Sequence, residues 1–349
     1  MLKIAKERLN DLYAKIYESM GLYIPIKRAG EVNYAVWAEG KEVSLETLKT
    51  VKSPKSAFFP QTENLMKFKS EGKNLEVIDV REKLSQKIEE RPFVMFGVKA
   101  CDYKAIEVLD KVFLADPVDT YYQLRREAAT IVTLACSRPE ESCFCKAFGI
   151  DATSPMGDVT TWMDETYLYW QANTEKGEAL TASVKDLFAE GGEEEVAAQK
   201  EATNAIIDKL PYSNLDLSRF KPENLNELFN EKEWEEMSEA CLGCGTCTFV
   251  CPTCQCFDIR DFKTNEGVLR YRCWDSCMYS DFTLMAHGNS RNTQMQRFRQ
   301  RFMHKLVYYP SQNDGLYSCV GCGRCVNKCP QNLNIVKVIK TLGGKNNND

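Results

Sequence analysis

The stretch from Cys241 to Cys256, CLGCGTCTFVCPTCQC, constrains this chain more than any other feature. It contains the pattern C-x2-C-x2-C-x3-C followed by proline, and a second copy, CVGCGRCVNKCP, begins at Cys319. In this pattern the first three thiolates surround one iron–sulfur cube, and the fourth cysteine ligates the other cube. Glycines between the cysteines permit tight turns that direct backbone amides toward the sulfurs. The two copies therefore predict two [4Fe-4S] clusters that exchange their fourth ligands.

This exchange assigns four cysteines to each cluster. Cluster 1 takes three cysteines of the first motif and the last cysteine of the second: Cys241, Cys244, Cys247 and Cys329. Cluster 2 takes the remaining four motif cysteines: Cys251, Cys319, Cys322 and Cys325. Structural zinc is the alternative, but zinc sites usually divide their ligands into two pairs that lie far apart in sequence. Two matched four-cysteine runs, each closed by a proline, favour iron–sulfur clusters.

Upstream of the first motif, short apolar runs alternate with helical patterns. The apolar runs at 75–80, 93–97 and 130–135 are typical of buried strands, and helical patterns at 104–113 and 121–128 separate the last two. Such alternation is typical of sheets with parallel strands. We therefore expect an N-terminal domain of the α/β or α+β class with a mixed, partly parallel sheet.

Further elements are expected around this core. An amphipathic pattern predicts a helix at 2–20, a strand follows at 34–38, and the segment 53–68 is expected to open a helix. Residues 158–185 indicate a small β-hairpin that ends with a turn near Lys176. The chain is thus expected to divide into an α/β domain at 1–190, a linker helix at 191–220, and a mainly helical domain with a two-cluster ferredoxin-like core at 221–349.

Four cysteines of the N-terminal half are expected to meet. Cys101 lies a few residues beyond the strand at 93–97, and Cys136 directly follows the strand at 130–135. The carboxyl ends of parallel strands share one edge of a sheet, where ligands bind. A short polar loop later come Cys143 and Cys145. Ordinary buried cysteines are the alternative, but four converging thiols match a third [4Fe-4S] cluster, which we predict here.

About seventy residues separate the two motifs, and this insert contains four more cysteines. They are Cys254, Cys256, Cys273 and Cys277. They are compatible with a fourth cluster, with a zinc site, with groups that contact the other clusters, or with plain buried residues. The basic stretch from Arg291 to Lys305 predicts an amphipathic helix with a cationic face. Its cations would stabilise a reduced cluster, although a salt-bridged surface helix explains the pattern equally well.

Composition excludes several functions for this chain of 349 residues. A net charge of −5 does not indicate nucleic-acid binding, and two histidines are too few for a histidine-rich catalytic metal site. Glycine-rich nucleotide-binding motifs are absent, and no catalytic residue is identified. No apolar run approaches the roughly 18 residues of a membrane span. Of the 16 cysteines, 12 lie in ligand-like groups, namely the eight of the two motifs and the four of the N-terminal half. Cysteines of this kind must stay reduced, so a reducing, anaerobic cytoplasm is expected.

Six segments occur in an order that resembles a known family: GVKACDY, ACSRPEESCFC, CLGCGTCTFVCPTCQCFD, WDSCMYSDFTLMA, MHK and CVGCGRCVNKCP. Together they are similar to the A subunit of anaerobic sulfite reductase and the β subunit of sulfhydrogenases, over most of residues 53–330. By this resemblance, seven cysteines outside the ligand sets of clusters 1 and 2 match shared positions: Cys101, Cys136, Cys143, Cys145, Cys254, Cys256 and Cys277. Cys273 does not match.

The resemblance implies an electron-transfer subunit of a cytoplasmic oxidoreductase complex. Such subunits work beside a flavin- and NAD(P)-binding subunit and a terminal catalytic subunit, which is a siroheme sulfite reductase or a hydrogenase. Because nicotinamides deliver hydride and clusters accept single electrons, the chain is expected to depend on a partner's flavin. Two alternatives stay open. One is an enzyme that reduces a sulfur compound at the N-terminal cluster, and the other is a cluster-bearing scaffold with little electron flux.

Overall fold

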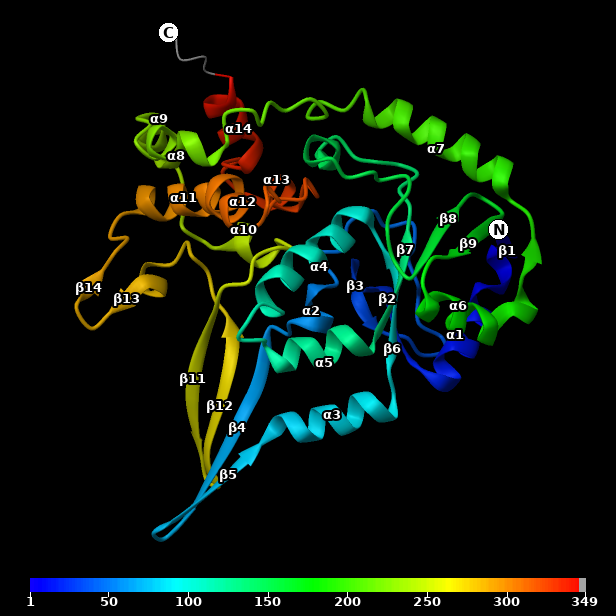
Figure 1. Ribbon diagram of the computed structural model, residues 1–349, viewed down its shortest axis with the longest axis horizontal. Helices are drawn as coiled ribbons and strands as arrows, with labels where there is room; N and C mark the ends of the chain where they lie inside the picture. The colour runs from blue at the N-terminus through cyan, green and yellow to red at the C-terminus, as the bar shows by residue number, and fades with distance from the viewer. Residues whose placement is uncertain (345–349) are drawn as a thin grey trace.

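The computed structural model describes residues 1–344, and its largest element is a mixed eight-stranded sheet (Figure 1). The strand order is β10-β1-β9-β8-β7-β6-β2-β3. The central strands β6 (Phe93–Val98) and β7 (Ala129–Leu134) are parallel and buried along their whole length. On either side, β2 (Gly21–Arg28) and β8 (Val159–Met163) also pair in parallel with them. The expected mixed, partly parallel sheet is therefore confirmed.

The outer strands pair antiparallel, and they are β1 (Leu2–Ala5), β3 (Glu31–Val36), β9 (Tyr167–Ala172) and β10 (Ala189–Glu190). The helix expected over 2–20 is wrong at its start, because Leu2 and Ile4 alternate along β1 and only α1 (Leu9–Ser19) is helical. The hairpin of β8 and β9 is confirmed. The turn expected near Lys176 is wrong, since this residue lies in α6 (Glu175–Val184), which Thr174 caps.

Alternate residues of β6 face two helical layers. Val94 and Phe96 pack in one core with α1 and α6. Phe93 and Met95 pack in another core with α4 (Ala100–Phe113) and with Tyr122 of α5 (Thr120–Ala128). Both faces of the central strands are thus covered, which explains why their sequences are apolar throughout rather than alternating.

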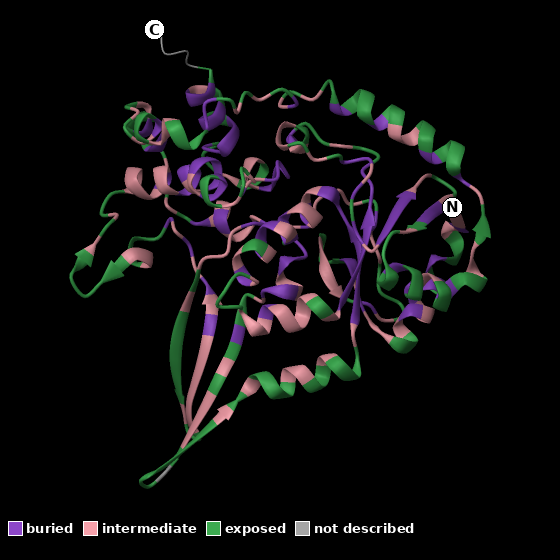
Figure 2. Cartoon of the chain, viewed as in Figure 1, coloured by how far each residue is buried: buried purple, intermediate pink, exposed green. Residues whose placement is uncertain are grey.

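A second sheet has four antiparallel strands in the order β11-β12-β4-β5 and projects from the body of the molecule (Figure 1). Two strands come from the N-terminal half, β4 (Thr62–Glu71) and β5 (Asn74–Asp79), and two from the insert, β11 (Phe257–Thr264) and β12 (Gly267–Trp274). Much of this sheet is exposed (Figure 2).

Two expectations for this region are wrong. The segment 53–68 forms only one short helix, α2 (Lys55–Phe58), before it enters β4. The strand expected to be buried at 75–80 is the exposed edge strand β5, where the side chain of Leu75 is 64% exposed. Helix α3 (Val80–Glu90) follows it.

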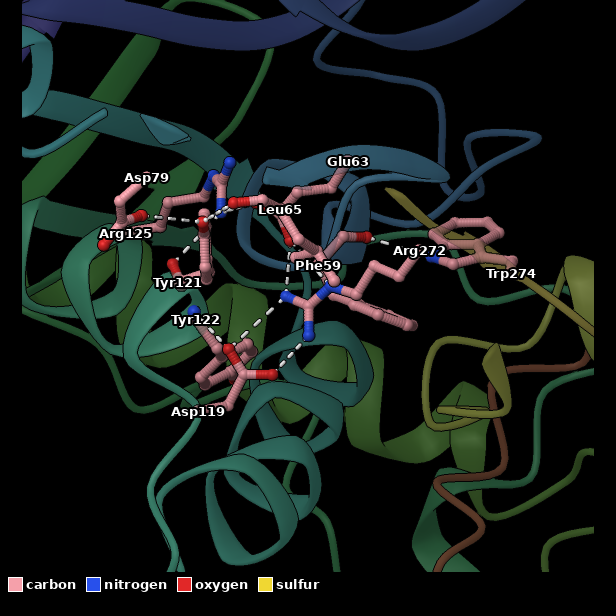
Figure 3. Close-up of polar contacts among 10 residues, drawn as sticks. All are labelled: Phe59, Glu63, Leu65, Asp79, Asp119, Tyr121, Tyr122, Arg125, Arg272 and Trp274. Carbon is pink, nitrogen blue, oxygen red and sulfur yellow. Dashed lines mark hydrogen bonds and ion pairs between the residues drawn. The ribbon is translucent and has the colours of Figure 1, made fainter. Parts of the chain in front are cut away.

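A buried ion network fixes the base of this second sheet against the body (Figure 3). Arg272 of β12 donates to Glu63 of β4 over 2.7 Å and pairs with Asp119, the N-cap of α5. Arg125 of α5 pairs with the same Glu63. Trp274 donates its indole N–H to the carbonyl of Phe59 over 3.1 Å. The insert between the cysteine motifs is therefore joined to the N-terminal half by buried polar contacts.

The C-terminal region is mainly helical, as expected, and α7 (Glu193–Ile207) leads into it across the top of the molecule (Figure 1). Its helices are α8 (Leu225–Phe229), α9 (Glu233–Ser238), α10 (Thr246–Phe249), α11 (Gln294–Met303), α12 (Tyr309–Gln312), α13 (Arg324–Lys328) and α14 (Ile335–Gly343). A small hairpin of β13 (Leu284–Met285) and β14 (Gly288–Asn289) precedes α11.

The expected basic helix is α11, which Thr293 and Gln296 begin with reciprocal capping bonds. A π-helical turn, His304–Tyr308, continues it. The apolar face of this helix packs on α9 and α14 around Phe298 and Phe302. The same two phenylalanines also line a cavity beside the cysteine loops. Over residues 1–344, none of the helices combines the length and apolar character that crossing a membrane requires.

Candidate metal centres

The four cysteines predicted for cluster 1 line one cavity: Cys241, Cys244, Cys247 and Cys329. Cys241 and Cys244 lie on the loop that leads into α10, Cys247 lies in the first turn of α10, and Cys329 directly follows α13. Since α10 and α13 pack against each other, the last cysteine of the second motif reaches the first motif. Gly243 and Gly245 hold φ values of +63° and +72° in this loop, a conformation that strains other residues.

The cysteines predicted for cluster 2 also come together. Burial raises the pKa values of Cys319, Cys322 and Cys325, and the charge of Cys251 raises each of them further. The hydroxyl of Thr253 donates to the carbonyl of Ser318 over 2.7 Å. The loop of Cys251 therefore lies against the start of the second motif, although Cys251 precedes the other three cysteines by about seventy residues. The structure thus brings together both exchanged sets that the sequence predicts.

The four N-terminal cysteines, which form the third set, line a cavity of their own, here called the third cavity after that set: Cys101, Cys136, Cys143 and Cys145. The first lies in the opening turn of α4, after β6, and the second follows β7. The edge that these two parallel strands share therefore brings their cysteines together, as the sequence analysis expects. Burial and the neighbouring thiols raise the pKa of Cys145 to about 12.

The third cavity adjoins the second motif, because Gly321 and Cys322 are part of its lining. The amide of Phe144 donates to the carbonyl of Gly321 over 2.9 Å. A Cβ atom at Gly321 would lie 2.4 Å from the carbonyl group of Phe144, so only glycine permits this approach. The loop of the N-terminal cysteines and the loop of the second motif therefore form one packed unit.

A buried arginine lies among the thiols of both motifs. Arg301 of α11 is 2% exposed, and its Nη2 donates to the carbonyl of Cys247 over 2.9 Å. Its Nε and Nη1 make no hydrogen bond within the described part of the chain. The thiols that raise its pKa, against the lowering effect of burial, include Cys247 of the first set and Cys325 of the second.

Orphaned guanidinium N–H groups in an interior are costly unless an anionic acceptor satisfies them. The sulfurs of [4Fe-4S] clusters would supply such acceptors at both sets, because four thiolates leave a cube with net negative charge. The cysteine-lined cavities, the left-handed glycines and this arginine therefore fit clusters of that kind.

Three further buried cations surround the cysteines. Lys305 donates to Thr253 Oγ1 over 2.7 Å and to the Ser318 carbonyl over 2.9 Å. Lys55 donates to the carbonyls of Cys251 and Cys254 over 3.0 and 2.9 Å, and burial lowers its pKa to about 8.

The third of these cations, Arg324, makes two bonds to the carboxylate of Asp102, over 2.6 and 2.7 Å. This buried pair links α13 of the second motif to α4, which contains Cys101. The sequence analysis anticipated cations on α11, but it missed Lys55, for which the sequence offers no local signal. It also missed Arg324, whose place between two cysteines of the second motif is a usable signal.

The insert cysteines separate into two groups. Cys254 lies beside Cys251, and Cys256 lies beside Cys277, whose hydrogen bonding lowers the pKa of Cys256 to about 7. The charge of Cys254 also acts on Cys277, so these thiols form one group. Cys273, on β12, instead has Arg260, Asp258 and Asp275 as its charged neighbours.

Single-ion sites have a different geometry. A zinc ion needs its sulfurs about 2.3 Å from one point. Within residues 1–344, no three His, Cys, Asp or Glu side chains are arranged in that way around one metal ion. The N-terminal cysteines and those of the first motif instead line cavities.

Comparisons with known proteins agree with this arrangement. Residues 240–333 match the family model of a 4Fe-4S dicluster domain, a range that includes both cysteine motifs and the insert. Over 344 residues the chain is 33% identical to the sulfhydrogenase 2 subunit beta of Pyrococcus furiosus, and the match covers 97% of each chain. Identity at this level over nearly the full length shows common descent. The chain therefore belongs to the family of sulfhydrogenase β subunits, electron-transfer subunits with a 4Fe-4S dicluster domain.

Proposed function

We propose that this chain relays electrons through three [4Fe-4S] clusters inside a cytoplasmic multisubunit oxidoreductase. The ligands are the two exchanged sets of the motifs and a third set: Cys101, Cys136, Cys143 and Cys145. Bound clusters supply one-electron transfer, and the protein sets their potentials and spacing. One observation carries the proposal, namely that the three cysteine sets lie in series.

The series follows from shared residues. Cys322 of the second set also lines the cavity of the third set, so these two sets are adjacent. The buried guanidinium of Arg301 donates to the carbonyl of Cys247 of the first set and interacts electrostatically with the thiol of Cys325 of the second set. Those two sets are therefore adjacent as well. The second set is thus the middle one, and an electron would cross the chain in two steps.

The ends of this series would meet two partners. By analogy with the family, one partner binds flavin and NAD(P), and the other is a terminal catalytic subunit of the hydrogenase or siroheme sulfite reductase type. Cys244 of the first set is exposed, which suits contact with a partner at that end. The third set is more enclosed, since Cys136 and Cys143 are buried.

Metal analysis tests the cluster content. Anaerobically purified chain should contain about twelve iron and about twelve acid-labile sulfide, from three four-iron cubes. A Cys136→Ala variant should fall to about eight of each. Wild-type protein with only eight would eliminate the third cluster, whereas about sixteen would support a further centre at the insert cysteines Cys254, Cys256 and Cys277.

Reduction by nicotinamides tests the dependence on a partner. NADH or NADPH should leave the cluster absorbance of the isolated chain unchanged, and should bleach it once the flavin-binding partner is added. Direct reduction, or stoichiometric flavin on the isolated chain, would refute the relay.

A second candidate function is reduction of a sulfur compound at the third cluster. It is favoured by a cleft that adjoins the third cavity through Leu48, which lines both. Consumption of such a compound by the isolated, chemically reduced chain would support this function over the relay.

A further inference from the structure

The cleft beside the third cysteine set lies at the carboxyl ends of three parallel strands. It has a volume of about 490 Å³, which is within the usual range of small-ligand sites. Its walls include Lys99 after β6 and Met163 to Glu165 at the end of β8. Around the end of β7 they include Leu134, Ala135, Ser137 and Arg138. Helix α7, which crosses above the sheet (Figure 1), contributes Gln199. Ligands of open α/β sheets bind at this edge.

A buried cation lines the cleft without a protein partner. Lys99 is 8% exposed, and its Nζ makes no hydrogen bond or ion pair within residues 1–344. Its charged neighbours include the thiols of Cys136 and Cys101. The nearby carboxylate of Asp102 is already held by two bonds from Arg324. Burying an ammonium group is costly unless an anion compensates it.

A buried acceptor lines the same cleft. The amide nitrogen of Gln199 donates to the carbonyl of Met163 over 3.1 Å. This bond fixes the orientation of the amide group. Its Oε1 is buried and has no donor in the described chain. An unsatisfied buried acceptor favours a ligand that carries an N–H or O–H group.

The other charged groups of the cleft are mostly engaged. Glu46 pairs with Lys6 over 3.0 Å. Asp164 accepts bonds from the amides of Thr166 and Tyr167 and from the hydroxyl of Tyr169. Two exposed residues of opposite charge remain among the lining residues, Arg138 and Glu165. The buried part of the cleft therefore presents one positive charge and one acceptor.

We propose that this cleft binds a small protonated oxyanion. Lys99 holds the charged oxygen, and Gln199 Oε1 accepts a hydrogen bond from the hydroxyl group of the ligand. The bound anion lies next to the third cluster, because Cys136 stands between Ala135 and Ser137, which both line the cleft. A negative charge at that place disfavours an added electron, so the ligand lowers the midpoint potential of this cluster. Only this electrochemical consequence rests on the proposed function, since binding itself needs no cluster.

Calorimetric titration of the full-length, anaerobically prepared chain with inorganic phosphate tests the site. Wild-type protein is expected to bind phosphate saturably. Lys99→Met, which removes the charge, and Gln199→Glu, which places a carboxylate beside the anion, should each weaken binding about tenfold or more. Lys263→Met, on the exposed strand β11, is the matched control and should bind as the wild type does. Iron content shows that each variant is folded.

A redox titration with and without phosphate supplies the second readout. The third cluster of the wild type should shift to lower potential with phosphate, and that of Lys99→Met should not shift. The proposal is overturned if phosphate does not bind the wild type, or if Lys99→Met binds phosphate unchanged. It is also overturned if Lys99→Met alters the cluster potential while phosphate leaves the wild-type potential unchanged. In that case Lys99 is only a counter-ion of the cluster.

Discussion

Replacing Arg301 with methionine is expected to lower the midpoint potentials of clusters 1 and 2. Methionine has a side chain of similar length, but it is apolar, so the substitution removes one buried positive charge. That charge lies close to both sets, since Nη2 is 2.9 Å from the Cys247 carbonyl and the thiols of Cys247 and Cys325 both act on the guanidinium. Reduction adds an electron to a cube that is already anionic, so a lost cation makes reduction less favourable.

The size of the shift follows from Coulomb's law. At an effective dielectric constant of about 20, unit charges roughly 4 to 8 Å apart interact by about 4 to 2 kcal/mol. For a one-electron couple this corresponds to about 170 to 90 mV. The estimate applies to buried charges, which salt screens little. We therefore expect a fall of about 100 mV in at least one of the two clusters.

A redox titration followed by electron paramagnetic resonance under anaerobic conditions measures this shift. Arg299→Met is the matched control on the same helix, because Arg299 donates to the Phe229 carbonyl over 3.0 Å and lies over the ring of Phe229. Its potentials should stay close to those of the wild type. Arg301→Lys should retain most of the wild-type potential. If Arg301→Met keeps all its iron and shifts no further than Arg299→Met, the inference that Arg301 acts on the clusters is refuted.

Three further predictions concern the joints between the cysteine sets. Cys329→Ala should destroy the cluster held by Cys241, Cys244 and Cys247, and a spectroscopic loss confined to the Cys319 cluster would contradict the exchange of ligands. Asp102→Asn leaves Arg324 with an uncompensated buried charge and should lower the free energy of unfolding by about 3 to 5 kcal/mol. Urea titration measures this loss. The control is Asp314→Asn, which removes an exposed ion pair of 3.8 Å with Lys111 and should change the free energy of unfolding by less than about 1 kcal/mol. Gly321→Ala should lose iron from the second and third sets because its Cβ meets the Phe144 backbone, whereas Gly315→Ala, with φ of +79° and open space around it, should lose none.

The central strands, and the meeting of cysteines that lie far apart in the chain, could be predicted from the sequence because their signals are local. The motif spacing alone separates three ligands of one set from the fourth ligand of the other. The strands β6 and β7 are apolar throughout because both of their faces are covered. Cys101 and Cys136 could be brought together from the sequence because each follows one of these strands closely.

Elements whose partners are distant could not be predicted. The segment that becomes β4 pairs with its neighbour β5, but it also pairs with β12, whose residues lie about two hundred positions later. The sequence near β4 therefore does not indicate the whole strand. Leu75 and Val77 of β5 flank Glu76 in an alternating pattern, yet both side chains are exposed because one face of the edge strand packs on nothing in the described chain. Lys55 is polar in sequence and buried in the structure, since the carbonyls that it binds belong to the first cysteine motif.

The position of the insert explains why the two motifs can be so far apart. The ends of the insert are the two cysteine motifs, which must stay together for their ligands to exchange. Between them, β12 pairs with β4, and Arg272 reaches both Glu63 and Asp119. Thr253 and Lys305, which follows α11, lie near opposite ends of the same insert. Lys305 donates to the Thr253 hydroxyl, and both residues donate to the Ser318 carbonyl beside the second motif. The insert thus contacts both the N-terminal half and the second motif. Since every cysteine set then depends on segments distant in the chain, cluster assembly and folding of both halves should be coupled.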